Sequence, residues 1–250
     1  MDKTIIYYTD NKMEEPLFTK CQEHLKKTAG DIPIISVSQK PIDLGINICV
    51  GEIGSNWLNL YKQLLRGVEE VKTKYIGTAE HDCLYPREHL DWLPPRDDVY
   101  YYNENVWLVQ WGGNHPELNG MYSRFWGKRQ ALSSLVCNRE LLLKSLNKRL
   151  DLLDEARGGE KDMVRHLVFA GEPGLSLVRI KKAREIATSG RSDYLKTLLK
   201  DYLETEVADT FETKIPYLDI RHSTNFTGPK RGKNRTYSIP YWGKFEDIIT

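Results

Sequence analysis

Short apolar runs alternate with amphipathic stretches along the first 90 residues, and this order restricts the fold more than any other feature. The runs at 4–9, 32–38 and 74–79 are rich in β-branched and aromatic residues, which are typical of buried strands. The stretch at 14–27 repeats apolar residues at helical spacing, and a second such stretch follows Ser55, the expected N-cap. Strands alternating with helices predict a βαβαβ unit and therefore an α/β fold.

The second half of the chain has a less regular pattern. Its expected elements are two strands about a turn (98–111), three helices (Asn138 to about Leu153, one after Asp162, and 191–211) and a tail that folds onto the domain as a loop (216–250). The tail is rich in glycine, proline and aromatic residues.

The composition narrows the class of protein. The 250 residues, 40% of them apolar, suffice for a buried core, and we expect a single domain over 1–250. With 36 Lys and Arg against 35 Asp and Glu, the net charge is close to zero. The overall charge therefore does not indicate a nucleic-acid partner or an anionic membrane. The four cysteines are far apart, and no signal peptide or membrane-spanning run is evident. These features predict a cytoplasmic protein with reduced thiols, no membrane contact and no obligate protein partner.

An acidic triplet, Glu80-His81-Asp82, follows the strand predicted at 74–79. Strand alternation would direct Glu80 and Asp82 to one face and His81 to the other. Open α/β sheets bind ligands at the carboxyl ends of their strands, and two neighbouring carboxylates there are relieved by a divalent cation. Oxygen ligands suit Mn²⁺ or Mg²⁺, which share such sites with substrate phosphates. The plain alternative is a solvated acidic turn.

The segment at 64–82 resembles the signature of GT-A glycosyltransferases of the family 2 kind. In that family a helix with an RNxGxxxAxxxYI pattern leads into a strand that ends in a D-x-D metal motif. The matching residues here are Arg66, Gly67, Val68, Tyr75 and Ile76. Leu65 replaces the usual asparagine, and Glu80 replaces the first aspartate.

The resemblance implies an α/β fold with a GT-A (Rossmann-like, nucleotide-binding) mixed sheet flanked by helices. It implies a nucleotide-sugar donor, with a UDP-sugar expected, and Mn²⁺ or Mg²⁺ as cofactor. Residues 1–90 would form the nucleotide-sugar-binding half, 91–215 the acceptor-side half, and 216–250 a basic C-terminal loop closing on the donor.

Site residues follow from the same resemblance. Asp82 and the late His222 would bind the metal, while Glu80 would meet the ribose or a metal-bound water. The other expected donor contacts are Thr9, Asp10, Ser38, Arg66, Lys230 and Arg231. The alternatives are an ordinary Asx turn at Asp10 and a structural histidine at 222. Asp219 either coordinates the metal or pairs with Arg221.

The catalytic base of the family is an acid at the start of a later helix, and Glu160 and Asp162 are the candidates here. Helix capping by Asp162 is the alternative role for that residue. Sequence alone leaves open which acid acts and whether transfer is inverting or retaining.

Basic and aromatic residues gather at 112–130, and the acceptor-binding candidates are Arg124, Trp126 and Arg129. The chain is similar in general look to phage-type enzymes that glycosylate hydroxymethylated pyrimidines in DNA. That similarity makes DNA the acceptor expected here, with phosphate contacts from the basic segments and stacking on a flipped base. Saccharide or protein acceptors, a nucleotidyltransferase and a non-catalytic nucleotide- or nucleic-acid-binding module stay open.

Overall fold

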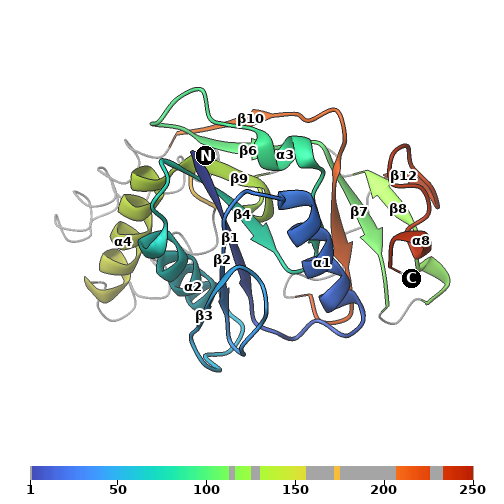
Figure 1. Cartoon of the computed structure of the whole chain (residues 1–250), viewed down its shortest axis with the longest axis horizontal. Helices are drawn as coiled ribbons and strands as arrows, with labels where there is room; N and C mark the ends of the chain where they lie inside the picture. Colours follow the sequence, from blue (N-terminus) through green and yellow to red (C-terminus); the bar gives the residue numbers. More distant parts are fainter. Residues whose placement is uncertain are drawn as a thin grey trace, which may run out of the picture.

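The computed structural model describes residues 2–112, 116–124, 130–155, 172–174, 207–225 and 233–249 (Figure 1). Its largest element is a seven-stranded sheet of order β10-β6-β9-β4-β1-β2-β3. The strands are β1 (Lys3–Thr9), β2 (Ile34–Ser38), β3 (Ile46–Cys49), β4 (Tyr75–Glu80), β6 (Tyr100–Asn103), β9 (Leu135–Asn138) and β10 (Ala208–Phe211). Strands β3, β2, β1 and β4 are parallel, whereas β9 runs antiparallel to β4 and β6, so the sheet is mixed.

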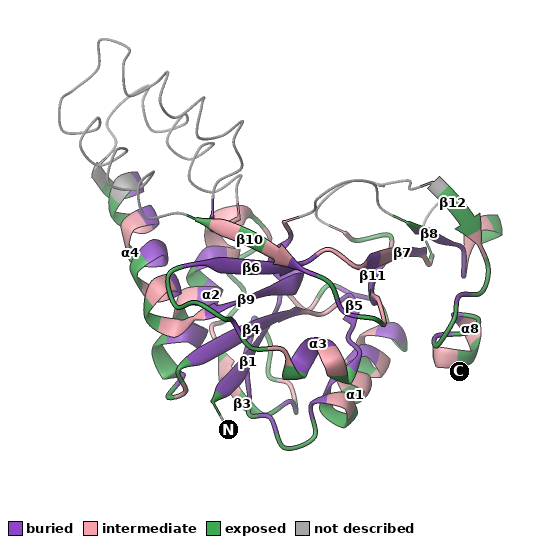
Figure 2. Ribbon diagram, turned by 90° about the horizontal axis from the view of Figure 1, so that it is seen from above, coloured by how far each residue is buried: buried purple, intermediate pink, exposed green. Residues whose placement is uncertain are grey.

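Helices cover both faces of this sheet because the inner strands are apolar on both sides. Helices α2 (Trp57–Glu70) and α4 (Arg139–Glu155) pack on the face that carries Ile6 of β1. Helix α1 (Leu17–Ala29) and the short α3 (Arg87–Asp91) pack on the opposite face, which carries Ile5. The inner strands are therefore buried along most of their length, as the purple ribbons of Figure 2 show. The fold is the mixed α/β sheet flanked by helices that the sequence predicts.

Gly67 explains how closely α2 approaches the sheet. A Cβ atom at this position would lie 2.6 Å from Cγ2 of Ile6, which is fully buried in β1. The glycine of the segment that resembles the GT-A signature thus has a packing role in this chain, because any larger residue would push α2 away from β1.

A second, five-stranded sheet of order β12-β8-β7-β11-β5 adjoins the first. It contains β5 (Cys83–Leu84), β7 (Val106–Gln110), β8 (Tyr122–Arg124), β11 (Tyr217–Arg221) and β12 (Lys233–Thr236). The 3₁₀ turns η1 (Pro116–Leu118) and η2 (Leu132–Ser134) and the terminal helix α8 (Glu246–Ile249) complete the described elements. A third apolar cluster, which includes Val109, Tyr122, Ile220 and Phe245, holds this sheet to the C-terminal segment.

Several sequence predictions need correction. The two strands expected in 98–111 exist as β6 and β7, but they belong to different sheets and do not pair as a hairpin. Residues 208–211 form strand β10 rather than the end of a helix, and 191–206 lie outside the described residues. The tail was expected as a loop, although 217–220 has a strand-like sequence; these residues form strand β11, which lies between β7 and β5. These strands pair with partners far away in sequence, which periodicity does not reveal.

The α2 N-cap is also one residue later than expected. Asn56, not Ser55, accepts a hydrogen bond from the backbone N–H of Asn59 at 2.9 Å. Ser55 is thereby left to donate its hydroxyl hydrogen to Asp10. Within the described residues no helix combines the length and the apolar character that crossing a bilayer requires.

Candidate functional site

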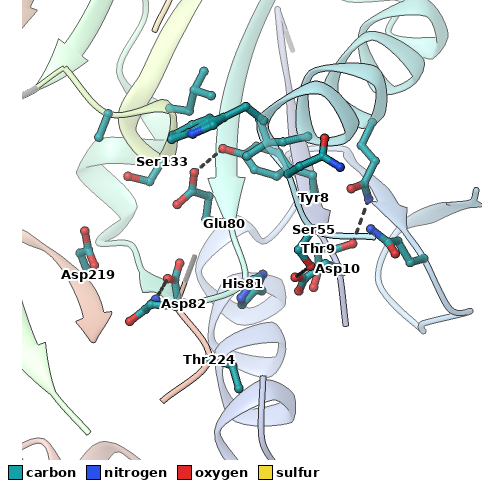
Figure 3. A pocket seen from close by; sticks show the side chains of 18 of the residues that line it. Tyr8, Thr9, Asp10, Ser55, Glu80, His81, Asp82, Ser133, Asp219 and Thr224 are labelled. Atoms are coloured by element: carbon teal, nitrogen blue, oxygen red, sulfur yellow. Dashed lines mark hydrogen bonds between the residues drawn. The ribbon is translucent and has the colours of Figure 1, made fainter. Parts of the chain in front are cut away.

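A cavity of about 330 Å³ opens where the parallel strands β1, β2 and β4 end (Figure 3). Its walls come from the residues that end or follow β1 (8–10), β2 (39) and β4 (80–82), from the loop before α2 and its first turns (54–57, 60 and 63), and from 131–133 and Glu172. In and after β11 the lining residues are Asp219, Arg221, Thr224 and Asn225. Ligands of open α/β sheets bind at this edge because the strand ends diverge there and leave a crevice.

Asp82 is the centre of a group of possible metal ligands. One ligand atom each from His81, Asp82 and His222 lies within 4.8 Å of the others. His222 Nε2 is 3.7 Å from Asp82 Oδ2, and Asn225 donates a hydrogen bond to the same oxygen at 2.7 Å. The structure thus places the two predicted metal residues, Asp82 and His222, side by side.

His81 does not point away from Asp82 as the strand alternation predicted. Strand β4 ends at Glu80, and residues 81 and 82 form a turn. The alternation of side chains along a strand therefore does not apply to His81 and Asp82. His81 consequently lines the same cavity as Asp82, as Figure 3 shows, and its ring lies 5.8 Å from that of His222.

The electrostatics of this group favour side chains that can donate an electron pair to a metal ion. Burial alone would raise the pKa of the Asp82 carboxyl, but the nearby His222, His81 and Arg221 hold that pKa well below its usual range. Burial also lowers the pKa of His81, despite the opposing charges of Asp82 and Asp10. A carboxylate and a neutral imidazole are the forms that bind metal ions.

A second grouping, Glu80, Asp82 and Cys83, is less suited to a metal ion. Burial, together with the charges of Asp82, Asp219 and Glu80, raises the pKa of the Cys83 thiol well above its ordinary value, and a metal ligand must be the thiolate. One carboxylate oxygen of Glu80, Oε1, already accepts a hydrogen bond from the Tyr8 hydroxyl at 2.5 Å (Figure 3). The donor set that fits a divalent cation is therefore His81, Asp82 and His222.

One wall of the cavity carries a buried ion pair. Arg221, the last residue of β11, donates to Asp219 Oδ1 at 3.2 Å, and both side chains are 5% exposed. The structure thus has Asp219 pairing with Arg221, one of the two roles left open by the sequence. Arg221 is a fixed cation beside the possible metal ligands, and a diphosphate needs such a charge.

The opposite end of the cavity is built from amides and hydroxyls. Gln39 holds the loop before α2 by donating to Gly54 O at 2.9 Å and accepting from Gly54 N at 3.1 Å. Gln63 donates to the carbonyl oxygens of Thr9, at 2.9 Å, and Val37, at 3.1 Å. With the Ser55–Asp10 bond and the ring of Trp57, this end presents polar groups and an aromatic face to a ligand.

The structure brings together some of the predicted donor contacts and separates others. Thr9, Asp10 and Glu80 line the cavity. Ser38 is fully buried and its hydroxyl accepts from Asn47 at 2.9 Å, so it does not reach the cavity, and the next residue, Gln39, takes its place. Arg66 lies on the solvent side of α2, where it pairs with Glu69 and Glu70, and is not part of the cavity wall.

The remaining predictions concern the acceptor side. Arg124 is exposed at the end of β8, in the second sheet, and is not among the cavity residues. The predicted residues that lie outside the described part of the chain are Glu160, Asp162, Lys230, Arg231, Trp126 and Arg129.

The sequence predicted that the segment 38–40 would line the cavity, and of these residues Gln39 does so. Sequence reasoning missed other cavity residues, including Tyr8, Ser55, Trp57, Arg221 and Glu172. Most of them follow a predicted strand or begin a predicted helix, and that position was the available signal. Glu172 had no such signal, because the pattern around 172–174 is irregular.

No protein-family model matches the sequence, and neither does any curated protein. Among solved structures, the chain is similar to a glycosyltransferase involved in the glycosylation of the major capsid of PBCV-1 (8% identity, TM-score 0.42, 88% of this chain and 93% of that chain). It is also similar to the glycosyltransferase GlyE of Streptococcus pneumoniae TIGR4 (12%, 0.41, 90% and 55%) and to the bifunctional IspDF of Campylobacter jejuni (10%, 0.37, 66% and 46%). The chain thus spans about half the length of the last two. At these values the activities of these proteins are not transferred to this chain.

Proposed function

We propose that the chain is a metal-dependent glycosyltransferase that moves a sugar from a nucleotide-sugar donor, a UDP-sugar, to an acceptor hydroxyl. The observation that carries the proposal is the buried Asp82 carboxylate between two imidazoles, in a cavity at the carboxyl ends of parallel strands. Such a cavity accepts a nucleotide, and such a donor set accepts a divalent cation, Mn²⁺ or Mg²⁺.

The two ends of the cavity suit the two parts of a nucleotide sugar. The amide- and hydroxyl-rich end with Trp57, Gln39 and Asp10 offers stacking and hydrogen bonds to a nucleoside. The other end has Arg221, whose fixed positive charge binds a diphosphate. Held by Asp82 and His222, a divalent cation would offset the charge that grows on the departing nucleoside diphosphate.

Between these ends, Glu80 is oriented by Tyr8 and accepts hydrogen bonds from a ribose or from water. We keep Glu160 or Asp162 as the expected base that takes the acceptor proton. Glu172 is a described carboxylate in the cavity wall and is a further candidate for the same role.

The acceptor belongs to the proposal as well. We propose a hydroxymethylated pyrimidine in DNA, because the segments around Arg124–Arg129 and Lys230–Arg235 are locally basic in a nearly neutral chain. A cytoplasmic location accords with such a substrate. Saccharide and protein acceptors are the outcomes against which this choice is tested.

Incubation with Mn²⁺ and a panel of nucleotide sugars, with normal and hydroxymethylated DNA as acceptors, tests the proposal. Nucleosides analysed by mass should gain a hexose or pentose on modified DNA alone. Donor hydrolysis with unaltered DNA would redirect the acceptor to saccharides or proteins. Neither hydrolysis nor transfer from any donor would contradict glycosyl transfer, and nucleotide binding without turnover would then favour a binding module.

Substitution of Asp82 shows whether donor turnover comes from the assigned site or from a contaminating enzyme. Asp82→Asn should remove metal-dependent hydrolysis of the donor. Asp43→Asn changes a carboxylate that is fully exposed beside Lys26, and it should leave turnover unaltered. Equal loss in both variants, or in neither, would count against the assigned site.

A further inference from the structure

The hydrogen bonds of Thr224 determine which nitrogen of His222 carries a proton. The Thr224 hydroxyl donates to the backbone oxygen of Lys12 at 3.1 Å, and its oxygen lies 3.1 Å from His222 Nδ1. A hydroxyl has one hydrogen, and a carbonyl oxygen has none to give. Nδ1 therefore donates to Thr224, and in the neutral ring Nε2 carries the lone pair.

That lone pair is buried and aimed at Asp82. The His222 side chain is 6% exposed, and Nε2 has no hydrogen-bond partner among the described residues. The carboxylate oxygen 3.7 Å away is itself an electron-pair donor. A buried polar atom without a partner is costly, and two facing donors without a proton repel each other. A cation between them removes both costs.

Asn225 holds this arrangement in place. Its Oδ1 accepts the backbone N–H of His222 at 2.6 Å, while its Nδ2 donates to Asp82 Oδ2 at 2.7 Å. Because the backbone N–H can only donate, the amide orientation is determined, and the side chain ties the two ligands together. Outer partners of this kind are typical of metal sites, where they orient the ligands.

His81 supplies a third donor from the turn after β4. Its ring meets that of His222 at 61°, its ligand atom lies within 4.8 Å of those of Asp82 and His222, and no hydrogen bond to its ring nitrogens is present in the part of the chain that is described. A D-x-D motif offers a metal only carboxylates. In this chain the corresponding residues are Glu80-His81-Asp82, and the middle residue, His81, faces the cavity and adds a nitrogen ligand.

We propose that His81, Asp82 and His222 together form a two-imidazole, one-carboxylate site, with His81 as a ligand, which selects a transition ion such as Mn²⁺, Co²⁺ or Zn²⁺ over Mg²⁺. Imidazole nitrogen binds transition ions well, whereas Mg²⁺ prefers oxygen ligands and retains its waters. The use of this ion in catalysis rests on the proposed glycosyl transfer, but the binding itself does not.

The test uses the full chain freed of metal with a chelator, without any nucleotide. Titration calorimetry with Mg²⁺, Mn²⁺ and Co²⁺, together with the visible spectrum of the Co²⁺ complex, measures affinity and ligand type. Affinity should rise from Mg²⁺ through Mn²⁺ to Co²⁺. His81→Asn should weaken Mn²⁺ and Co²⁺ binding by about 10-fold or more and alter the Co²⁺ spectrum, while Mg²⁺ binding stays within about two-fold.

Two other variants keep the result interpretable. His24→Gln removes a histidine of α1 that bonds Tyr85 O and does not line the cavity, and it should leave all three affinities unchanged. Thr224→Val removes the partner of Nδ1, and because this positioning residue no longer holds the ring, it should weaken Co²⁺ binding and broaden its spectrum. Thermal unfolding in chelator checks that each variant folds.

Three results would overturn the proposal. They are no binding of any of these ions, Mg²⁺ binding as tightly as Mn²⁺, or a Co²⁺ spectrum and affinity that His81→Asn leaves unchanged. The first is expected if the contact between His222 and Asp82 is only structural. Transition-ion binding that depends on His81, in a protein that transfers no sugar, would support this site and contradict only the proposed function. Sugar transfer by His81→Asn that works equally well with Mg²⁺ would support the proposed function and contradict the role of His81 as a metal ligand.

Discussion

Arg221 and Asp219 lie two residues apart on one strand, joined by a 3.2 Å hydrogen bond, with both side chains 5% exposed. A buried ion pair is poor evidence of stability, since two apolar residues of similar volume often serve as well. Its position in the cavity wall gives the more direct reason for its presence. The pair holds a positive charge where a diphosphate would lie.

Arg221→Ala should lower the free energy of unfolding by about 3 to 5 kcal/mol, because it removes the cation that pairs with the buried Asp219 carboxylate. Urea denaturation followed by circular dichroism measures the loss. The double variant Asp219→Leu/Arg221→Met should recover most of that stability but not nucleotide binding. Recovery of donor affinity in the double variant would show that the pair has no part in binding the diphosphate.

Asp82→Asn should reduce turnover by about 100-fold or more, because the carboxylate is the shared centre of the donor set. The amide has nearly the same shape and can still accept from Asn225, so unfolding should change little. Steady-state rates and urea midpoints, compared with Asp43→Asn, give both quantities. A variant that retains its rate would place the metal elsewhere.

The fold should lose stability in acid through His89. Burial, followed by the charge of Lys3, lowers the pKa of His89 to about 3, and Asn103 donates to its Nδ1 at 3.0 Å. Below the unfolded-state pKa of about 6.5, the unfolded chain binds a proton that the folded chain refuses. The stabilisation present above that pKa is therefore lost as the pH falls from about 6.5 towards 3, by up to about 1.4 kcal/mol per pH unit.

Urea denaturation at several pH values from 7 to about 4 measures this slope. His89→Gln should be less stable at pH 7, because it disturbs the bond to Asn103, yet its stability should fall less steeply with acidification. Parallel curves for the variant and the unaltered chain would mean that other groups, such as paired carboxylates, cause the acid sensitivity.

Gly67→Ala should destabilise the fold by about 1 to 3 kcal/mol, although alanine is the better helix former. The added methyl would lie 2.6 Å from Cγ2 of Ile6, and neither α2 nor β1 can yield without moving the core. Gly77→Ala is the matched control, since its Cβ would have its nearest contact at 3.8 Å. Equal stability of the two variants would mean that α2 shifts freely on the sheet.

Local patterns were enough to predict the first part of the fold. Strands β1, β2 and β4 and helices α1 and α2 are found where their apolar spacing indicated, because each buries its own repeating face. Strand β3 was missed: it is short, and its residues are exposed or half-buried at the sheet edge, so it has no strong apolar signal. The parallel pairing of β7 with β11 joins residues more than a hundred positions apart, and no spacing rule encodes it.

Some features of the candidate site were likewise predictable from the sequence, and others were not. The proximity of Asp82 and His222 was expected from the family resemblance, and the structure has them 3.7 Å apart. The inward direction of His81 was not foreseen, because a strand's last residue has to be known before alternation can be applied. The position of Arg66 on the solvent side of α2 depends on how the helix is rotated against β1, and the signature alone does not determine this.

The order in which the cavity walls occur along the chain has a consequence for biosynthesis. Residues 8–10 and 80–82 leave the ribosome early, whereas Arg221, His222, Thr224 and Asn225 come near the end of the described chain. A nascent chain that ends before β11 therefore contains His81 and Asp82 but lacks His222, the residue that follows this strand. The proposed ion site is therefore complete only after translation has passed β11, and a chain cut short before that strand should not bind the ion there.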